Sequence, residues 1–336
     1  MGMIDDLATV TKCGVETVKS NSVTNSFIES KRLELGFKKS NRLHFGNKKH
    51  QNCYDLKVHE NEMASSNQEK YIGDIISDDG KNTANIAARK AKWFGIAGDI
   101  LAILNAIPFG KYQTEAGIYM RNGMLINGML TNSEIWYGIT TDELKQLESV
   151  DEYLLRKILR GHSKTSIELI YLETGTIPIR YLLKARRINY LRTILNRDPS
   201  ELTSRVYFAQ KRRPVKDDWY IAVQSDLKEL ELTEENVKGM TKAIFKKCLK
   251  QKLLKAALNY LENIRLNHKK GSNLNYSKLE CQSYLKWNDL NMTEKSLLFR
   301  LRTETTDVRT NFSSKYADTK ELTTNYMYVI RPSIGS

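Results

Sequence analysis

The hydrophobic and polar positions along the chain follow two different periods. Before Gly80, short alternating segments predominate, such as those at 41–46 and 70–77, and these predict short β-strands separated by turns. One segment in this region, Val15 to Leu35, instead repeats its apolar residues at helical spacing, and Gly36 follows where a helix would end. The first eighty residues are therefore predicted to combine short strands with one helix.

Beyond Gly80 the apolar residues recur at intervals of three and four positions, which predicts a series of helices. Thr141 stands where a helix would begin, and Pro178 and Pro214 stand where helices would be interrupted. Together the two patterns predict an α+β protein that is mostly α, in which a small antiparallel sheet comes before the helices. The expected helices span 82–107, 112–130, 141–159, 179–195 and 241–270.

The charge of the chain is strongly unbalanced. Its 336 residues include 53 Lys and Arg against 39 Asp and Glu, a formal net charge of +14. Such an excess indicates a polyanionic partner, with nucleic acid first and an acidic membrane surface second. The most hydrophobic stretch, 93–110, includes Asp99, Asn105 and Pro108, so it is too short and too polar to span a bilayer. We therefore expect no membrane-spanning segment.

The four cysteines and five histidines form no ligand pattern. Because no Cys-x-x-Cys pair occurs, the sequence predicts neither a zinc site nor a disulfide framework. Reduced thiols are typical of a cytoplasmic or nuclear protein. Asp5 and Asp6 interrupt the only early apolar run, so no signal peptide is predicted. We expect a cytoplasmic or nuclear location.

The segment MIDDLATVT at 3–11 places a pair of carboxylates, Asp5 and Asp6, between apolar residues. This pattern predicts a strand, a tight turn and a second strand. Carboxylates at a hairpin tip can share divalent cations such as Mg²⁺, which hold triphosphate oxygens and activate an attacking hydroxyl. An Asp-Asp pair alone is more often a solvent-exposed turn, so the segments that follow it decide the interpretation.

The order of these segments resembles the end of the palm of reverse transcriptases from non-LTR (LINE-type) retrotransposons. Met3-Ile4-Asp5-Asp6 matches the Tyr/Phe-x-Asp-Asp motif of that palm, and ELGFKKSNRLHFG at 34–46 matches its Leu-x-Leu-x-x-x-Lys-Cys strand. Tyr71-Ile72-Gly73 matches a Tyr-Leu-Gly strand, and GDIISDDGKNTANIAARKAK and NGMLTNSEIWYG are similar to the thumb region. The resemblance implies a partial palm over 1–80, a thumb-like helical domain over 81–232, a basic helical extension over 233–316 and a disordered tail over 317–336.

The resemblance also implies roles for individual residues. Asp5 would bind Mg²⁺ directly and Asp6 would support it, which makes both of them catalytic metal ligands. Lys39 would approach the pyrophosphate leaving group of an incoming dNTP; the alternative is an exposed hairpin lysine. Tyr71, Ile72 and Gly73 would contact the primer 3′ end; the alternative for Tyr71 is an ordinary packed strand residue.

This sequence differs from the family at several positions that matter for polymerase activity. Met3 stands where the family has an aromatic residue, and Ser40 stands where it has Cys. The strand that supplies a third carboxylate and the fingers segment that grips the nucleotide would come before Met1, and the Cys/His knuckle found in many relatives is replaced by a different tail. In-line transfer requires two metals and a triphosphate held together. We therefore expect a truncated fragment that binds nucleic acid and does not polymerise alone.

Positive charge gathers on several predicted helices. In a polymerase thumb such helices follow the duplex phosphates, where Lys and Arg act through counterion release without reading sequence. A single Lys on a helix is usually just solvated, but here the excess recurs, and nine Lys or Arg face one Glu within 241–270. The implied partner is RNA or RNA–DNA duplex, and no small-molecule ligand other than dNTP is expected. The implied contacts are Arg89, Lys90, Lys92, Lys184, Arg186, Arg187 and Arg192.

Two other interpretations stay open at this point. One is a non-catalytic helical protein that binds RNA or DNA, in which the Asp pair is only a turn. The other is a scaffold that pairs its 241–270 helix with a helix of a protein partner. The four tryptophans, Trp93, Trp136, Trp219 and Trp287, are expected in the core. The apolar stripe of the 241–270 helix is predicted to consist of Phe245, Cys248, Leu249, Leu253, Ala256, Leu261 and Ile264.

Overall fold

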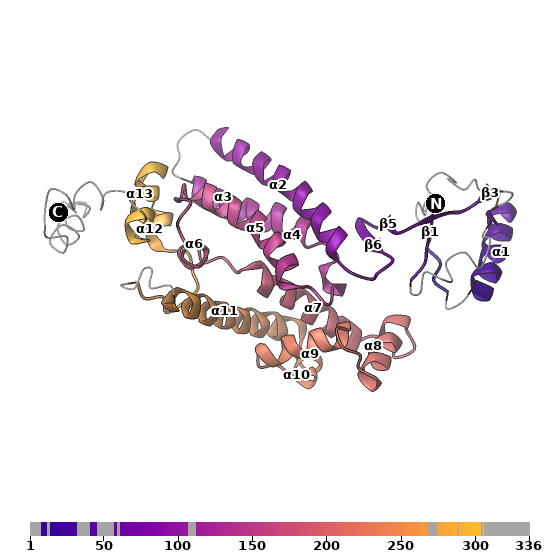
Figure 1. The fold of residues 1–336 in the computed structure, drawn as a ribbon. Coiled ribbons are helices and arrows are strands. Elements are labelled where there is room, and N and C mark those ends of the chain that lie inside the picture. The colour runs from indigo at the N-terminus through magenta and orange to yellow at the C-terminus, as the bar shows by residue number, and fades with distance from the viewer. Residues whose placement is uncertain are drawn as a thin grey trace, which may run out of the picture. The chain divides into compact units, whose positions relative to one another are not determined.

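The computed structural model describes residues 8–11, 14–31, 41–45, 57–58, 61–106, 112–267, 274–287, 289–303 and 305. Within these ranges helices predominate and strands are short, which confirms the predicted α+β class with mostly α structure (Figure 1). No helix in the described ranges combines the length and the apolar character that a membrane span requires.

The chain forms two compact units, each assembled from separate stretches of sequence. The division into four consecutive domains stays a prediction. The first unit draws on 1–95, 128–150 and 182–240, and the second draws on 96–127, 151–181 and 241–336.

In the described part of the first unit, six short strands pair into three two-stranded sheets. The β2–β3 and β5–β6 pairs are antiparallel, as predicted. The β1–β4 pair is parallel, which corrects the prediction of a purely antiparallel sheet. Two antiparallel strands can be joined by a tight turn, but two parallel strands need a longer connection. The chain between β1 and β4 includes β2 and β3 and supplies such a connection. The strands are β1 (Asn41–Leu43), β2 (Lys57–Val58), β3 (Asn61–Glu62), β4 (Ala64–Ser66), β5 (Gln68–Tyr71) and β6 (Asp74–Ser77).

A two-residue turn joins β5 to β6. Tyr71 pairs with Asp74, so Ile72 and Gly73 make the turn between them. The backbone φ angle is +47° at Ile72 and +86° at Gly73, and positive φ at both positions defines a type I′ turn. The prediction that Tyr71–Gly73 belongs to one strand is therefore wrong. The usual Asn-Gly signal for this turn is absent, and the apolar Ile72 concealed it.

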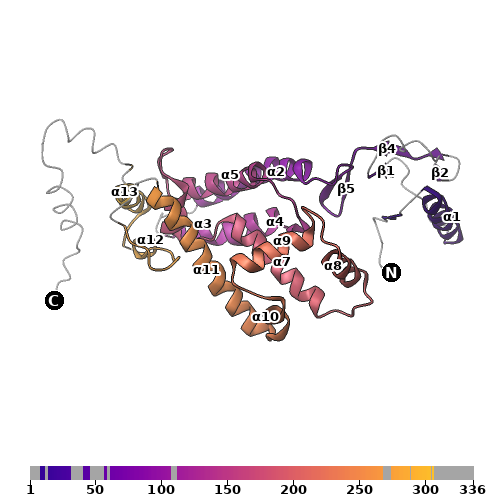
Figure 2. The same ribbon diagram turned by 60° about the horizontal axis from the view of Figure 1, so that its bottom comes forward.

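The helical periodicity predicted most of the helices of the chain. Three of them are confirmed as α2 (Thr83–Ala106), α5 (Thr141–Ile158) and α7 (Ile179–Leu195), and residues of each helix belong to both units. In the first unit α8 and α9 pack against each other (Figure 2). The remaining helices of this unit are α1 (Gly14–Ser30), a 3₁₀ turn η4 (Ser133–Ile135), α8 (Leu202–Arg212), α9 (Trp219–Glu229) and α10 (Glu234–Gly239).

The helix predicted over 112–130 is interrupted. It divides into α3 (Gln113–Met120), a π-helical segment η3 (Arg121–Ile126) and α4 (Asn127–Met129). The Arg121 side chain is fully buried at the start of η3 and donates hydrogen bonds to both carboxylate oxygens of Asp151 and to the Ile177 carbonyl. A π-turn widens the helix by one residue, and apolar spacing alone does not reveal it.

In the second unit α11 (Lys242–Asn267) packs against α6 (Ile167–Thr174), and α12 (Ser283–Lys286) and α13 (Met292–Arg302) follow. The helix predicted at 241–270 is thereby confirmed. Its stripe differs in detail, because the structure buries Ala257 and Arg265 where the prediction had Ala256 and Ile264, and it leaves the predicted Cys248 only half-buried. A buried row that repeats every four residues slants around the helix and suits a partner that crosses at an angle. The buried row is Phe245, Leu249, Leu253, Ala257, Leu261 and Arg265.

The four tryptophans occupy different environments. Trp136 and Trp219 are buried, which confirms the predicted core position for both, and Trp93 is half-buried. Trp287 is 45% exposed, so the prediction is wrong for this residue. Trp287 directly follows the four-residue helix α12, and so short a helix offers little surface to cover its ring.

Candidate nucleic-acid interface

The residues assigned to polymerase chemistry, Asp5, Asp6 and Lys39, lie outside the residues that the structure describes. Their roles, and the Mg²⁺ that the two aspartates would bind, stay predictions. Among the described residues, no group of three or more His, Cys, Asp or Glu side chains is placed to hold a metal ion. The predicted contact residues that the structure does describe lie in the β5–β6 turn and on the basic helices.

The turn between β5 and β6 is exposed and strained. Ile72 is 63% exposed, and a Cβ added at Gly73 would meet no heavy atom within 4 Å. A residue with a side chain in the left-handed region costs about 1–2 kcal/mol, and a β-branched one such as isoleucine is rarely found there. Because most of the Ile72 side chain is exposed to solvent, its packing against the rest of the chain offsets little of this conformational cost. The conformation must therefore be held by neighbouring groups.

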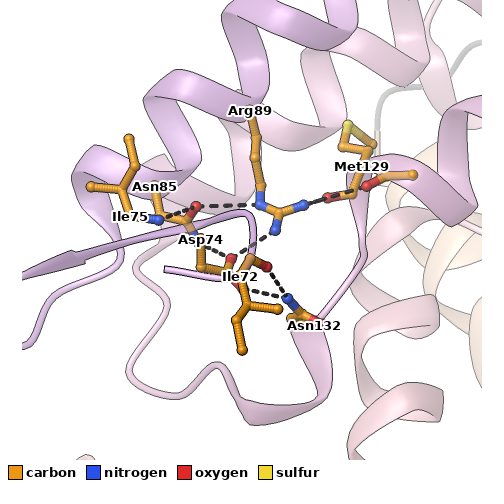
Figure 3. A network of polar contacts seen from close by, with 8 residues as sticks. Ile72, Asp74, Ile75, Asn85, Arg89, Met129 and Asn132 are labelled. Atoms are coloured by element: carbon orange, nitrogen blue, oxygen red, sulfur yellow. Dashed lines mark hydrogen bonds and ion pairs between the residues drawn. The ribbon is translucent and has the colours of Figure 1, made fainter. Parts of the chain in front are cut away.

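A polar network holds the turn in this conformation (Figure 3). The Asn132 Nδ2 donates to the Ile72 carbonyl at 3.1 Å and to Asp74 Oδ2 at 2.8 Å. On the other side Asp74 Oδ1 accepts from Asn85 Nδ2 at 2.7 Å, and the Ile75 amide donates to Asn85 Oδ1 at 3.2 Å. Asp74 is thus tied both to α2 and to the segment after α4, and Ile75 is tied to α2.

Arg89 occupies the centre of this network. Its Nη2 pairs with Asp74 Oδ1 at 2.7 Å, its Nη1 donates to the Met129 carbonyl at 2.8 Å, and its Nε donates to Asn85 Oδ1 at 3.3 Å. Its guanidinium carbon lies 4.9 Å from the centre of the Trp136 ring, within the range of a cation–π contact. Only 8% of the Arg89 side chain is exposed. In the described structure Arg89 serves the fold, and its predicted contact with nucleic acid stays a prediction.

Arg187 on α7 is also held by a buried ion pair. Its Nε and Nη2 donate to the two oxygens of Asp226 on α9 at 2.6 and 3.1 Å, a bidentate geometry that favours Arg over Lys. Both side chains are almost fully buried. Its neighbour Arg186 is half-buried, and burial lowers the pKa of the Arg186 guanidinium, with Glu134 opposing and Arg89 adding to the decrease. The structure therefore brings Arg89, Arg186 and Arg187 together.

The other four predicted contacts are dispersed. Lys184 pairs with Glu229, and Arg192 donates to the Met240 carbonyl at 3.0 Å. Lys90 is half-buried. Lys92 is exposed, with its ammonium 5.3 Å from the centre of the Trp93 ring. Of the seven residues, Lys92 thus presents its charge most openly to solvent.

The most open positive surface among the described helices belongs to α11. Lys242, Lys246, Lys247 and Lys250 are exposed, and we call these four residues the lysine row of α11. No Asp or Glu occurs in α11 before Glu262. Lys242, Lys246 and Lys250 follow one another at intervals of four, so they lie on one line along the helix.

This lysine row opposes the stability of its own helix. Like charges four residues apart destabilise a helix by about 0.2–0.5 kcal/mol per pair. Lys242, in the first turn, also opposes the helix macrodipole, which favours an anion at the N-terminus by about 0.3–1 kcal/mol. The neighbouring row of α11 residues is buried and holds the helix in place. An arrangement that weakens the helix and leaves the charge exposed is suited to an anionic partner.

Sequence reasoning missed the residues that organise the turn, Asp74 and Asn132, and the Asp226 partner of Arg187. A partial signal existed for Asn132, which has φ +60°, because Asn is enriched in the left-handed region and in turns. Nothing local marks Asp74 as the partner of Arg89, since an ion pair across fifteen residues requires the tertiary fold.

Comparisons of the chain with protein-family models, curated proteins and solved structures found no match.

Proposed function

We propose that this chain binds RNA or RNA–DNA duplex as the palm-end and thumb region of a retrotransposon reverse transcriptase. The lysine row of α11 carries the proposal, because four exposed lysines stand together with no carboxylate in the helix before Glu262. The order of the sequence motifs supports the reverse-transcriptase part of this proposal. The apolar stripe of α11 is buried within the chain, which gives no support to the scaffold interpretation.

Phosphates are the partners that such a row suits best. A nucleic-acid strand presents regularly spaced negative charge, and each Lys that neutralises a phosphate releases a condensed counterion. Binding of this kind is strong at low salt and independent of base sequence. Lysines at a spacing of four residues advance about 6 Å along the helix axis, so the row can follow a run of phosphates.

Salt dependence of duplex binding tests the proposal. Fluorescence anisotropy with a short labelled RNA–DNA duplex would measure the Kd at a series of salt concentrations from about 50 to 200 mM. The substitutions Lys246→Gln, Lys247→Gln and Lys250→Gln, made together, are expected to weaken binding and to reduce the slope of log K against log salt by about 2–3. The helix itself should remain folded, because the substitutions remove only repulsive pairs.

A matched control separates local from overall charge. Lys81→Gln, Lys145→Gln and Lys238→Gln remove the same net charge from exposed positions elsewhere. This control protein is expected to keep most of the slope. Equal losses in the two triple variants would show that only net charge matters, and an unchanged affinity in the α11 triple variant would contradict the proposed surface.

The polymerase part of the proposal has a separate test. A template–primer, Mg²⁺ and labelled dNTPs are added to the purified chain, and no primer extension is expected. Mg²⁺ binding, measured by titration calorimetry, is expected to disappear when Asp5→Asn and Asp6→Asn are combined, while duplex affinity stays the same. Extension of the primer would contradict the expectation that the chain does not polymerise alone.

A further inference from the structure

Helix α8 presents apolar residues to solvent along one side. Leu202 is 73% exposed and Val206 is 50% exposed, and their spacing of four residues places them one above the other on the helix. Ala209 follows near the next turn and is exposed as well. Ser204 and Tyr207, on the other side of the helix, are buried. One side of α8 is therefore packed, and the other is apolar and open to solvent.

Aromatic contacts fix α8 in this orientation. The centre of the Tyr207 ring lies 6.1 Å from that of Trp219 and 5.8 Å from that of Tyr220, and both partners belong to α9. Aromatic pairs at such separations contribute stability beyond the area that they bury. Because Tyr207 is held in this cluster, α8 cannot rotate to bury its exposed apolar residues.

Arginines share the exposed side of α8. Arg205 and Arg212 are exposed, and their spacing of seven residues places them along one edge of this side. Arg213 caps the helix at its end, and α8 contains no Asp or Glu. An open hollow of about 310 Å³ is lined by Ala209 and the last two arginines. We call this surface the outward face of α8; it consists of Leu202, Arg205, Val206, Ala209, Arg212 and Arg213.

We propose that the outward face of α8 is the docking site for an acidic amphipathic helix of a protein partner. The apolar residues of such a helix cover Leu202 and Val206, in the manner of helices that lie in apolar grooves. Its carboxylates pair with the arginines, whose guanidinium groups bind carboxylates in a bidentate geometry. Arg is enriched at protein interfaces, where surrounding contacts exclude water from its ion pairs. The inference does not depend on the proposed function, because α8 is a different helix from α11.

The apolar part of the outward face favours a protein over other anionic partners. A phosphate backbone would neutralise the arginines but would leave Leu202 and Val206 uncovered, and interfaces with nucleic acid are more polar than those between proteins. A helix that binds an anionic membrane buries an apolar face in the lipid along its length. In α8 the large exposed aliphatic residues stand in the first half, and the last turn is basic.

Binding of a designed peptide tests the inference. The probe is a labelled helical peptide with leucines at positions i, i+3, i+4 and i+7 and glutamates beside them. Fluorescence anisotropy measures its Kd for the full chain. A peptide of the same composition in shuffled order carries the same charge without an apolar face. We expect saturable binding of the designed peptide and at least about tenfold weaker binding of the shuffled one. Equal binding of the two peptides would overturn the inference.

Two double variants separate the apolar from the charged contacts. Leu202→Gln with Val206→Gln keeps good helix formers and removes the apolar contact, so peptide affinity is expected to fall by about tenfold. Arg205→Glu with Arg212→Glu is expected to abolish binding of the glutamate peptide and to create binding of a peptide with lysines in the glutamate positions. A chain that had lost its fold would not gain this new specificity.

A matched control and three further outcomes decide the result. Lys145→Glu with Lys238→Glu makes the same change of net charge at exposed positions outside α8 and is expected to keep most of the peptide affinity. The inference is overturned if the unchanged chain shows no saturable peptide binding below about 100 μM. It is also overturned if RNA–DNA duplex displaces the peptide, which would assign the face to nucleic acid. Binding to phosphatidylserine vesicles that both α8 variants abolish would assign the face to a membrane surface and would overturn it too. Failure of the unchanged chain to bind duplex would contradict the proposed function alone.

Discussion

Arg89 provides the sharpest test of how the first unit is built. The sequence placed it among the predicted phosphate contacts, but the structure surrounds it with Asp74, Asn85 and the Met129 carbonyl. The substitution Arg89→Met keeps an unbranched stem with good helix propensity and removes the guanidinium group. It is therefore expected to destabilise the chain.

The expected magnitude follows from the groups that lose a partner. Removal of one member of a buried ion pair costs about 3–5 kcal/mol. Asp74 keeps two amide donors, from Asn85 and Asn132, and its side chain is 13% exposed, so the lower end of this range applies. We expect a loss of about 3 kcal/mol in the free energy of unfolding. Adding Asp74→Asn to Arg89→Met should recover part of the loss, because the unpaired carboxylate is then removed as well.

Urea unfolding followed by tryptophan fluorescence measures this loss directly, since Trp136 lies against the guanidinium group. Lys92→Met on the same helix is the matched control, because it removes one positive charge from an exposed position and should change stability by less than about 0.5 kcal/mol. If Arg89→Met unfolds at the same urea concentration as Lys92→Met, the structural role assigned to Arg89 is wrong. A stable Arg89→Met protein with weaker duplex affinity would instead identify a phosphate contact.

Three further predictions concern other contacts. Gly128→Ala should destabilise by about 1–3 kcal/mol or more, measured by urea unfolding, because the new Cβ would lie 1.9 Å from the Trp93 ring. Glu173→Gln should cost about 2–3 kcal/mol by the same measurement, because this buried carboxylate accepts hydrogen bonds from Tyr276 and Tyr284. Burial, and then the Glu173 charge, raise the pKa of both tyrosines in the folded chain. The unfolded tyrosines release protons first, so the free energy of unfolding should fall as pH rises above about 10, and Tyr276→Phe with Tyr284→Phe should flatten that fall.

The sequence alone determined the class of the fold and the extent of its main helices. Helical spacing located α5 and α7 to within a residue, because the buried face of a helix repeats every three to four residues whatever it packs against. The same local reasoning located α11 and its lysine row, since charge and periodicity are properties of neighbouring residues. The sequence also suggested the motif order from which the family was inferred, although that family stays a prediction.

Only the tertiary structure decided what the buried cations do. Arg89 meets Asp74 across fifteen positions and Arg187 meets Asp226 across thirty-nine, and no local pattern specifies either pairing. The turn at Ile72 also depends on a distant residue, because Asn132 holds it sixty positions along the chain. A buried charge must find an opposite charge or hydrogen-bond partners wherever the fold brings them. For this reason the number of arginines follows from the sequence, but only the fold determines which of them are buried.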